Sequence, residues 1–412
     1  MNYIAKLCTA ITLVSLVTGC GDRADRYEEL SDTWPYYSDR AYSQQLRPCA
    51  IAETSFGSCS LQQLPVLGME SEKPSIDDIM GRLLVSHEWM AKRFEMLLHE
   101  LPDDFLQLFS AVTVVVIDGD VRPSYYTNIT GAIYLDPDRL WMDLDEIRVI
   151  SDKPDYRDGY DDPMSFRRAS RKMIGDDYAY KHYGLDSTEP RPLHDMVIPM
   201  ASLLAHELAH ANDYLPSSRY NDIDRSRGIY WVTEDLKRDS ISRHLKENHP
   251  LQSYEMFRLA DILFSGVTPS EEDTKVTAEE VGAYFNSDIA SYIYAYTSSN
   301  EDFAMLVEDT LMKMHFDVDR DQAFIIRDER VEEQFDGSRS VIGWGIRNRL
   351  GDEEVKARAR IALEYIIPDR DFSDFFNSLP LPTMLPYGYR WGDTLSLDPD
   401  VLSTKQPKIY TD

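Results

Sequence analysis

The sequence predicts an α+β fold that is predominantly helical and contains a small sheet. Apolar residues recur at helical spacing in several long stretches, whereas runs that suit strands are short and few. The chain has 412 residues, 43% of them hydrophobic and 11% aromatic, so it can bury one large core or two smaller ones. We therefore expect a globular protein in which helices pack around a limited amount of sheet.

The amino-terminal segment, residues 1–20, has the pattern of a bacterial lipoprotein signal peptide. A positive charge at Lys6 precedes the apolar residues 7–17, which are too few to span a bilayer, and Cys20 follows a small residue. Cleavage of such a signal exposes the cysteine for lipidation, so we expect Cys20 to carry a lipid anchor. Gly21 stands where the retention aspartate of inner-membrane lipoproteins would be, which favours the outer membrane. The alternative, an ordinary secretory signal, also predicts export.

Cysteine usage is consistent with export. Cys8 is lost with the signal and Cys20 is the lipidation site, which leaves Cys49 and Cys59 in the mature chain. Two thiols in an oxidising compartment predict one disulfide, and the alternative is two free buried thiols. We expect this pair to close a loop within a tether, residues 21–73, that joins the body to the membrane.

The formal net charge of -29, from 72 acidic and 43 basic residues, limits the partners of the chain. A surface of this sign repels phosphate backbones and anionic lipid headgroups. The acidic residues are spread along the sequence, which is typical of a solvated surface and not of an interaction tail. We therefore expect no nucleic-acid partner, and contact with the membrane through the lipid anchor.

Residues 74–378 carry the periodic patterns of a folded body. Apolar residues at helical spacing predict a helix that starts after Pro74 and continues to Pro102. Further elements are expected as strands at residues 112–117 and 131–135, and as helices at residues 200–214, 251–264, 277–285 (with a Thr277/Glu280 capping box), 300–315 and 352–367. The tail, residues 379–412, is rich in proline and aromatic residues, and we expect it to pack on the surface.

The clearest functional signal is the segment His206-Glu207-Leu208-Ala209-His210 within a predicted helix. Histidines four residues apart project from one face of a helix, so both imidazoles can bind a single zinc ion. The glutamate between them lies beside that face, where it can take a proton from water activated by the metal. We therefore expect Zn²⁺ at His206 and His210, with Glu207 as the catalytic base.

A catalytic zinc site also needs a third protein ligand and one open position. The residues that follow the motif do not supply this ligand in the metzincin manner. Asp213 stands where that pattern requires glycine, and Pro216 stands where it requires a histidine or aspartate ligand. We therefore expect the third ligand to come from a second helix downstream, as a glutamate does in gluzincins.

Two short segments resemble the family of bacterial metallopeptidases that includes the catalytic domain of anthrax toxin lethal factor. One is the histidine motif, continued by Ala211 and then by an acidic residue and a tyrosine. The other is residues 291–304, SYIYAYTSSNEDFA, where the family has a tyrosine, a ligand glutamate seven residues later, and then x-Phe-Ala. The resemblance implies a zincin-like catalytic core, a third zinc ligand at Glu301, and a catalytic tyrosine at Tyr294 that stabilises the oxyanion or protonates the leaving amine.

The second segment also departs from the family pattern. Asp302 replaces an aromatic residue and Ala295 replaces a glycine, which leaves Tyr292, Tyr296 and Asp302 as alternatives for the implied roles. Physical reasoning independently favours Glu301, because the dipole at the start of a helix stabilises a carboxylate in the first turn. The alternative for that residue is an exposed glutamate that only caps the helix.

Three further acidic positions have patterns that suggest a supporting role or a separate site. Asp213 and Asp302 are candidates for hydrogen bonds that orient the zinc-binding imidazoles. The acidic run at residues 317–321 opens like a calcium-binding loop, but Gln322 stands where the sharp turn of that loop requires glycine. We therefore expect a solvated acidic turn there.

Together these patterns predict a zinc-dependent peptidase of the bacterial envelope that acts on a protein or peptide. The alternative from another class is a catalytically silent lipoprotein that uses the zinc helix for structure or for binding a partner. Amide hydrolysis in cell-wall peptides would share the metal chemistry and differ in the substrate.

Overall fold

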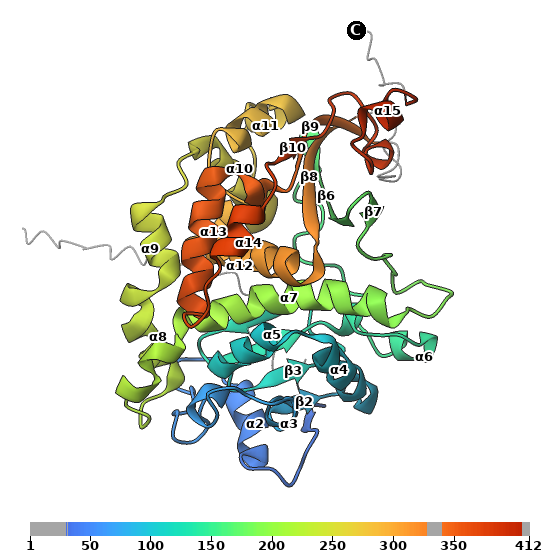
Figure 1. Ribbon diagram of the computed structural model, residues 1–412. Coiled ribbons are helices and arrows are strands. Elements are labelled where there is room, and N and C mark those ends of the chain that lie inside the picture. Colours follow the sequence, from blue (N-terminus) through green and yellow to red (C-terminus); the bar gives the residue numbers. More distant parts are fainter. Residues whose placement is uncertain (1–29, 31, 328–339, 406–412) are drawn as a thin grey trace, which may run out of the picture.

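The computed structural model describes residue 30, residues 32–327 and residues 340–405 of the chain. Cys20, the predicted lipidation site, lies outside these described residues. Helices dominate the fold and accompany two small sheets, which confirms the expectation of a mixed and mainly helical protein. The long helix α7 (Leu193–Tyr214) crosses the middle of the molecule, with one sheet on either side of it (Figure 1).

The first sheet is mixed and lies below α7 in Figure 1. Its spatial order is β1 (Trp34–Pro35), β2 (Leu83–Val85), β3 (Val115–Ile117), β5 (Ala132–Leu135) and β4 (Tyr125–Thr127). The three central strands are parallel and wholly buried, as is usual for parallel strands that are covered on both faces. The antiparallel strands β1 and β4 form the edges, and β4 lies against α7.

The second sheet is entirely antiparallel. Its spatial order is β10 (Thr383–Met384), β9 (Val341–Arg347), β8 (Asp319–Ile326), β6 (Phe166–Ile174) and β7 (Asp177–Tyr178). A buried ion cluster crosses it, because Asp321 accepts hydrogen bonds from Nε of Arg171 at 2.8 Å and from Nε of Arg347 at 2.7 Å. The same guanidinium groups donate to backbone carbonyls within residues 391–395, which holds the carboxyl-terminal segment against the sheet.

The remaining α-helices pack around the two sheets and α7. Their bounds are α2 (Ser43–Ala50), α3 (Ile76–Met80), α4 (Glu88–Glu100), α5 (Asp103–Leu108), α6 (Leu144–Ile147), α8 (Ile229–Leu236), α9 (Ile241–Asn248), α10 (Tyr254–Ser265), α11 (Ala278–Asn286), α12 (Ser299–Phe316), α13 (Glu353–Ile366), α14 (Ser373–Ser378) and α15 (Pro399–Leu402). Within the described part of the chain, no helix has both the length and the apolar character needed to cross a membrane.

Most of the predicted elements are present, with shifted ends. The strands predicted at residues 112–117 and 131–135 correspond to β3 and β5, and the later helices correspond to α7, α10, α11, α12 and α13. Helix α11 begins with the capping box predicted between Thr277 and Glu280. Helix α7 begins at Leu193, earlier than predicted, and continues through Pro199.

The prediction of one continuous helix between Pro74 and Pro102 is wrong. The structure has the short helix α3, then strand β2, and then α4. Three consecutive apolar residues at 83–85 suit either a strand or a buried helical turn, so spacing alone could not separate them. The strand forms because it pairs with β1 and β3 and buries both of its faces.

The prediction of a tether at residues 21–73 is wrong for residues 32–73, which the structure describes. These residues belong to the folded body. Strand β1 joins the first sheet, and Leu46 and Cys49 of α2 are buried. The disulfide between Cys49 and Cys59 is present, with a Cα–Cα distance of 5.5 Å. A two-residue strand and a short helix that contains proline give little periodic signal, which explains why the sequence did not predict this packing.

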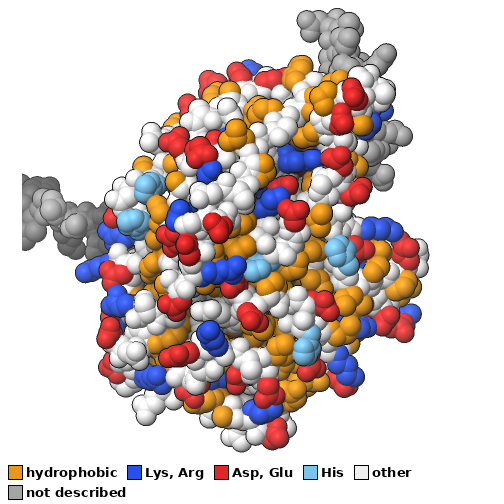
Figure 2. Space-filling view, viewed as in Figure 1, with side chains coloured by type: hydrophobic (Ala, Val, Ile, Leu, Met, Phe, Trp, Pro, Cys, Tyr) orange, Lys and Arg blue, Asp and Glu red, His pale blue; other side chains and the backbone are white. Residues whose placement is uncertain are grey.

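The acidic turn expected at residues 317–321 is also corrected. Residues from Asp319 onward form strand β8, and Asp321 is fully buried between two arginines. Their guanidinium groups compensate the charge of the carboxylate, and only the tertiary structure brings the three groups together. By contrast, acidic and basic side chains are intermingled over the outer face shown in Figure 2, as expected for a solvated surface.

Helices α12 and α13 are joined by a buried ion pair. Both guanidinium NH₂ groups of Arg358 donate to the Asp302 carboxylate, and Arg358 also donates to the backbone carbonyls of His249 and Ile289. Arg358 is 1% exposed, so water cannot replace these bonds. Removing one partner of such a pair leaves a buried charge without compensation.

We therefore expect Arg358→Ala to lower the free energy of unfolding by about 3 to 5 kcal/mol, measured by denaturant titration. The matched control is Arg360→Ala on the same helix, where a partly exposed arginine contacts Glu364 and Ser373 and a much smaller change is expected. Equal effects of the two substitutions would contradict the importance of the buried pair.

Candidate metal centre

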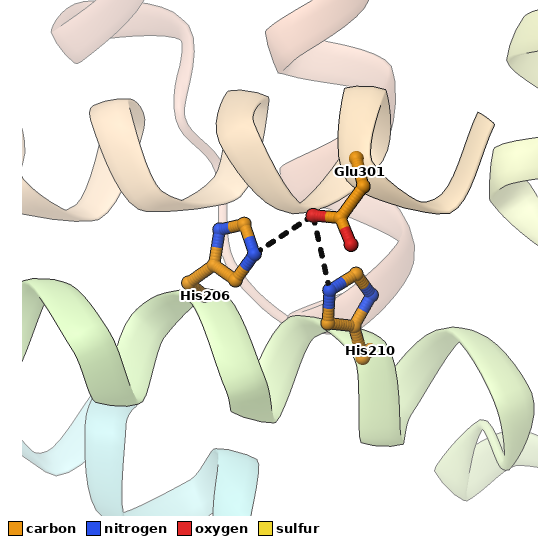
Figure 3. A group of neighbouring side chains, drawn as sticks. All are labelled: His206, His210 and Glu301. Carbon is orange, nitrogen blue, oxygen red and sulfur yellow. Dashed lines mark hydrogen bonds and ion pairs between the residues drawn. The ribbon is translucent and has the colours of Figure 1, made fainter. Parts of the chain in front are cut away.

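Helices α7 and α12 pack side by side and bring the candidate ligands together. The apolar residues Leu204, Ala205, Leu208 and Ala209 of α7 are fully buried, which fixes the rotation of this helix about its axis. His206 and His210 then lie one turn apart and face α12 (Figure 3). Figure 3 also shows Glu301, from the first turn of α12, placed between the two imidazoles.

The geometry of these three side chains suits one metal ion. One ligand atom from each of His206, His210 and Glu301 lies within 4.8 Å of the other two. Oε2 of Glu301 is 2.9 Å from Nε2 of His206 and 3.4 Å from Nε2 of His210. Two imidazole nitrogens and one carboxylate oxygen form a donor set that fits Zn²⁺. The structure thus brings together the three residues predicted as ligands.

Solvent can reach this site. The side chains of His206, His210 and Glu301 are 13%, 11% and 21% exposed. Among the described residues, no fourth histidine, cysteine, aspartate or glutamate joins the group. Three protein donors with access to solvent leave a coordination position for water or a substrate, as catalytic zinc sites require.

Glu207 lies next to the ligands and is 6% exposed. Burial raises the pKa of its carboxyl group above the usual range, and the two neighbouring histidines act against this rise. The backbone N–H of Tyr126, in strand β4, donates a hydrogen bond to the carboxylate. Glu207 is therefore held in place and has a raised proton affinity, as a general base requires.

Glu301 is held by the start of α12. The hydroxyl of Ser298 caps this helix by accepting a hydrogen bond from the backbone N–H of Glu301. Burial opposes ionisation of Glu301, but its interactions with His210 and His206 outweigh this effect and hold the pKa of the carboxyl group well below its usual range. The group is therefore an anionic donor at neutral pH.

Three tyrosines compete for the predicted catalytic role, and their surroundings differ. The ring of Tyr294 lies 6.2 Å from that of His206 and packs edge-on against Phe264. Tyr292 instead lies under the guanidinium group of Arg320, and Tyr296 is buried in the core around α10 and α11. Of the three, Tyr294 is thus the tyrosine beside the candidate metal ligands. Burial, followed by the nearby Glu301, raises the pKa of its hydroxyl, so this hydroxyl stays protonated and can donate a hydrogen bond.

The two aspartates predicted to orient imidazoles make other contacts. Asp213 accepts hydrogen bonds from the backbone N–H of Ser242 at 3.0 Å and from Nδ2 of Asn300 at 2.9 Å, so it supports the segment that carries Glu301. Asp302 binds Arg358 in the pair described above. Neither contact is the imidazole contact that we predicted, and both predictions are corrected accordingly.

The carboxylate beside an imidazole of the site comes from Glu308, and not from Asp213 or Asp302. Its Oε2 atom is 3.4 Å from Nδ1 of His206, on the opposite side of the ring from Glu301. Sequence reasoning missed this residue, although a spacing of seven residues along α12 puts Glu301 and Glu308 on the same helix face. A carboxylate at Nδ1 favours the tautomer in which Nε2 is free to bind a metal.

Glu308 is itself fixed by the second sheet. Its Oε1 atom accepts hydrogen bonds from Nζ of Lys172 at 2.7 Å and from the guanidinium group of Arg320 at 2.6 Å, and also from the hydroxyl of Ser202. Burial raises the pKa of a carboxyl group, but these two cations hold the pKa of Glu308 well below its usual range. Burial also lowers the pKa of Lys172 to about 8. Strands β6 and β8 therefore help to orient His206.

No protein-family model, curated protein or solved structure matches this chain.

We expect Glu308→Gln to weaken zinc binding about 10-fold to 100-fold, because the amide is a weaker acceptor for the Nδ1 proton of His206. Competition with a chromogenic chelator measures this affinity. The exposed Glu353→Gln serves as a control that should bind zinc as the wild type does. Unchanged affinity in a folded Glu308→Gln protein would show that the contact has no role in holding the metal.

Proposed function

We propose that this chain is a zinc-dependent peptidase. The proposal rests on one observation, which is the convergence of His206, His210 and Glu301 from two helices beside the buried carboxylate of Glu207. Catalytic zinc sites commonly combine three such donors with an adjacent general base. The resemblance of the two sequence segments to the lethal-factor family of metallopeptidases supports the same activity and a zincin-like core.

The groups around the site have complementary roles in amide hydrolysis. A divalent ion bound here would act as a Lewis acid toward water and the substrate carbonyl. Glu207 takes a proton from the attacking water and can pass it to the leaving amine. The protonated hydroxyl of Tyr294 can donate a hydrogen bond to the carbonyl oxygen, on which negative charge develops in the transition state.

The unpaired edge of strand β4 is evidence that the substrate is an extended peptide. Strand β4 ends the first sheet, so its outer backbone groups have no strand partner within that sheet. Such an edge can pair with an extended peptide. The backbone N–H of Tyr126, within β4, already donates to Glu207, so a peptide aligned along this edge would pass close to the base.

We further propose that the protein acts in the bacterial envelope as an outer-membrane lipoprotein anchored through Cys20. The disulfide between Cys49 and Cys59 supports an oxidising compartment. The second candidate function is a zinc-containing binding or structural lipoprotein without activity. The access of solvent to all three ligands favours the enzyme, because structural zinc sites are usually closed by four protein ligands.

The role of Glu207 can be tested with Glu207→Gln, which removes the base and leaves the ligands intact. We expect hydrolysis of a quenched fluorescent casein to fall by at least about 100-fold. Metal analysis should find equal zinc in the two proteins and a loss of zinc in Glu301→Ala. Wild-type activity no higher than that of zinc-loaded Glu207→Gln would refute the peptidase and favour the binding protein.

The role of Tyr294 predicts a different kinetic signature. Tyr294→Phe should lower kcat by about 100-fold to 1,000-fold with little change in KM, because the hydroxyl acts mainly on the transition state. Tyr292→Phe and Tyr296→Phe are matched controls in the same segment and should retain kcat within a few fold. A larger loss in either control would assign the role to that tyrosine.

A further inference from the structure

Exposed aromatic rings gather at the disulfide-bonded end of the first sheet. Phe56 is 91% exposed and Trp231 of α8 is 42% exposed, and their ring centroids are 6.2 Å apart in an edge-to-face arrangement. The ring of Tyr230 lies 5.0 Å from that of Trp231. We call Phe56, Tyr230 and Trp231 the aromatic surface. Large apolar groups clustered in the open commonly mark a contact surface.

The aromatic surface is held by covalent and backbone bonds. The disulfide between Cys49 and Cys59 closes the loop that carries Phe56. The backbone N–H of Ile229 donates to the carbonyl of Cys59 at 3.0 Å, and that of Tyr230 donates to the hydroxyl of Ser58 at 3.1 Å. The loop and the start of α8 therefore form one unit, which presents the rings without covering them.

The chain enters the folded body beside this unit. Leu30 is buried in the same apolar cluster as Cys49 and Ala50, and Arg47 of α2 donates to its carbonyl oxygen. Leu30 lies ten residues after Cys20, a stretch that covalent geometry limits to roughly 35 Å. A lipid on Cys20 would therefore hold this end of the molecule close to the bilayer. The second sheet lies at the opposite end (Figure 1).

The few charged groups around the aromatic surface permit it to approach a bilayer. The loop at residues 50–60 contains one ionisable side chain other than its disulfide-bonded cysteine, that of Glu53, in a chain with a net charge of -29. Beside Trp231, the carboxylate of Asp235 is paired with Arg227, which reduces the negative field there. The charge of the whole chain still disfavours an anionic membrane. A zwitterionic phospholipid surface is therefore the better match.

We propose that the aromatic surface rests in the headgroup region of a zwitterionic phospholipid bilayer. Aromatic rings with a polar edge, such as those of Tyr230 and Trp231, favour this depth of a membrane. The lipid anchor then fixes the distance of the body from the bilayer, and the aromatic surface fixes its orientation. This inference rests on the proposed anchor at Cys20 and is independent of the peptidase activity.

The test uses the full acylated chain in phosphatidylcholine and phosphatidylethanolamine vesicles that contain phospholipids brominated at the headgroup end of their acyl chains. Bromine quenches tryptophan emission on contact. We expect these lipids to quench a fraction of the tryptophan emission of the wild type. In Trp231→Phe this quenched fraction should be much smaller. The control is Trp344→Phe in the second sheet, for which quenching by brominated lipids should be as large as in the wild type. Phe56→Ser should also reduce quenching while the Cys49–Cys59 disulfide, checked by mass, remains intact.

Several outcomes would overturn the proposal. If brominated lipids quench wild type and Trp231→Phe equally, Trp231 does not touch the bilayer. If Trp231 is shielded from aqueous acrylamide but not quenched by brominated lipids, a protein partner or a second copy covers the surface instead. If the mass of the amino-terminal peptide shows no acyl group, Cys20 carries no lipid. That result would overturn the proposal because nothing would then hold the aromatic surface near the bilayer.

Discussion

The packing of α7 against α12 is the constraint on which the candidate site depends. His206 and Glu301 are 95 residues apart in sequence, and they meet because the two helices lie side by side. Buried apolar residues on α7 set its rotation, and the Ser298 cap sets where α12 starts. A rotation of either helix by one residue would turn a ligand away, since successive residues on a helix point about 100° apart.

Buried ion pairs extend this constraint to the rest of the molecule. Glu308 connects His206 to Lys172 and Arg320 in the second sheet, and Asp302 connects α12 to Arg358 of α13. Each pair satisfies charges that would be costly to bury alone. Glu301, Asp302 and Glu308 lie on one helix but make separate connections, to the metal site, to a neighbouring helix and to a sheet. Helix α12 therefore organises both the site and its surroundings.

The sequence was most informative where a local pattern carries the chemistry. The spacing of His206 and His210 predicted two ligands on one helix face, and residues 291–304 pointed to Glu301 across a long separation, which the structure brings together. Short elements such as β1 and β2 were not predicted, because two or three residues carry no period. Glu308 and Asp321 were missed for a different reason. Their environments consist of basic groups from distant strands, which only the folded chain assembles.

The ion cluster at Asp321 has a consequence for the order in which the protein folds. Arg171 and Arg347 complete their hydrogen bonding with carbonyls in residues 391–395. Until that segment docks, both arginines lack some of the acceptors that they need when buried. The second sheet can therefore reach its final state only after residues 391–395 have packed against it, which makes their docking a late step of folding.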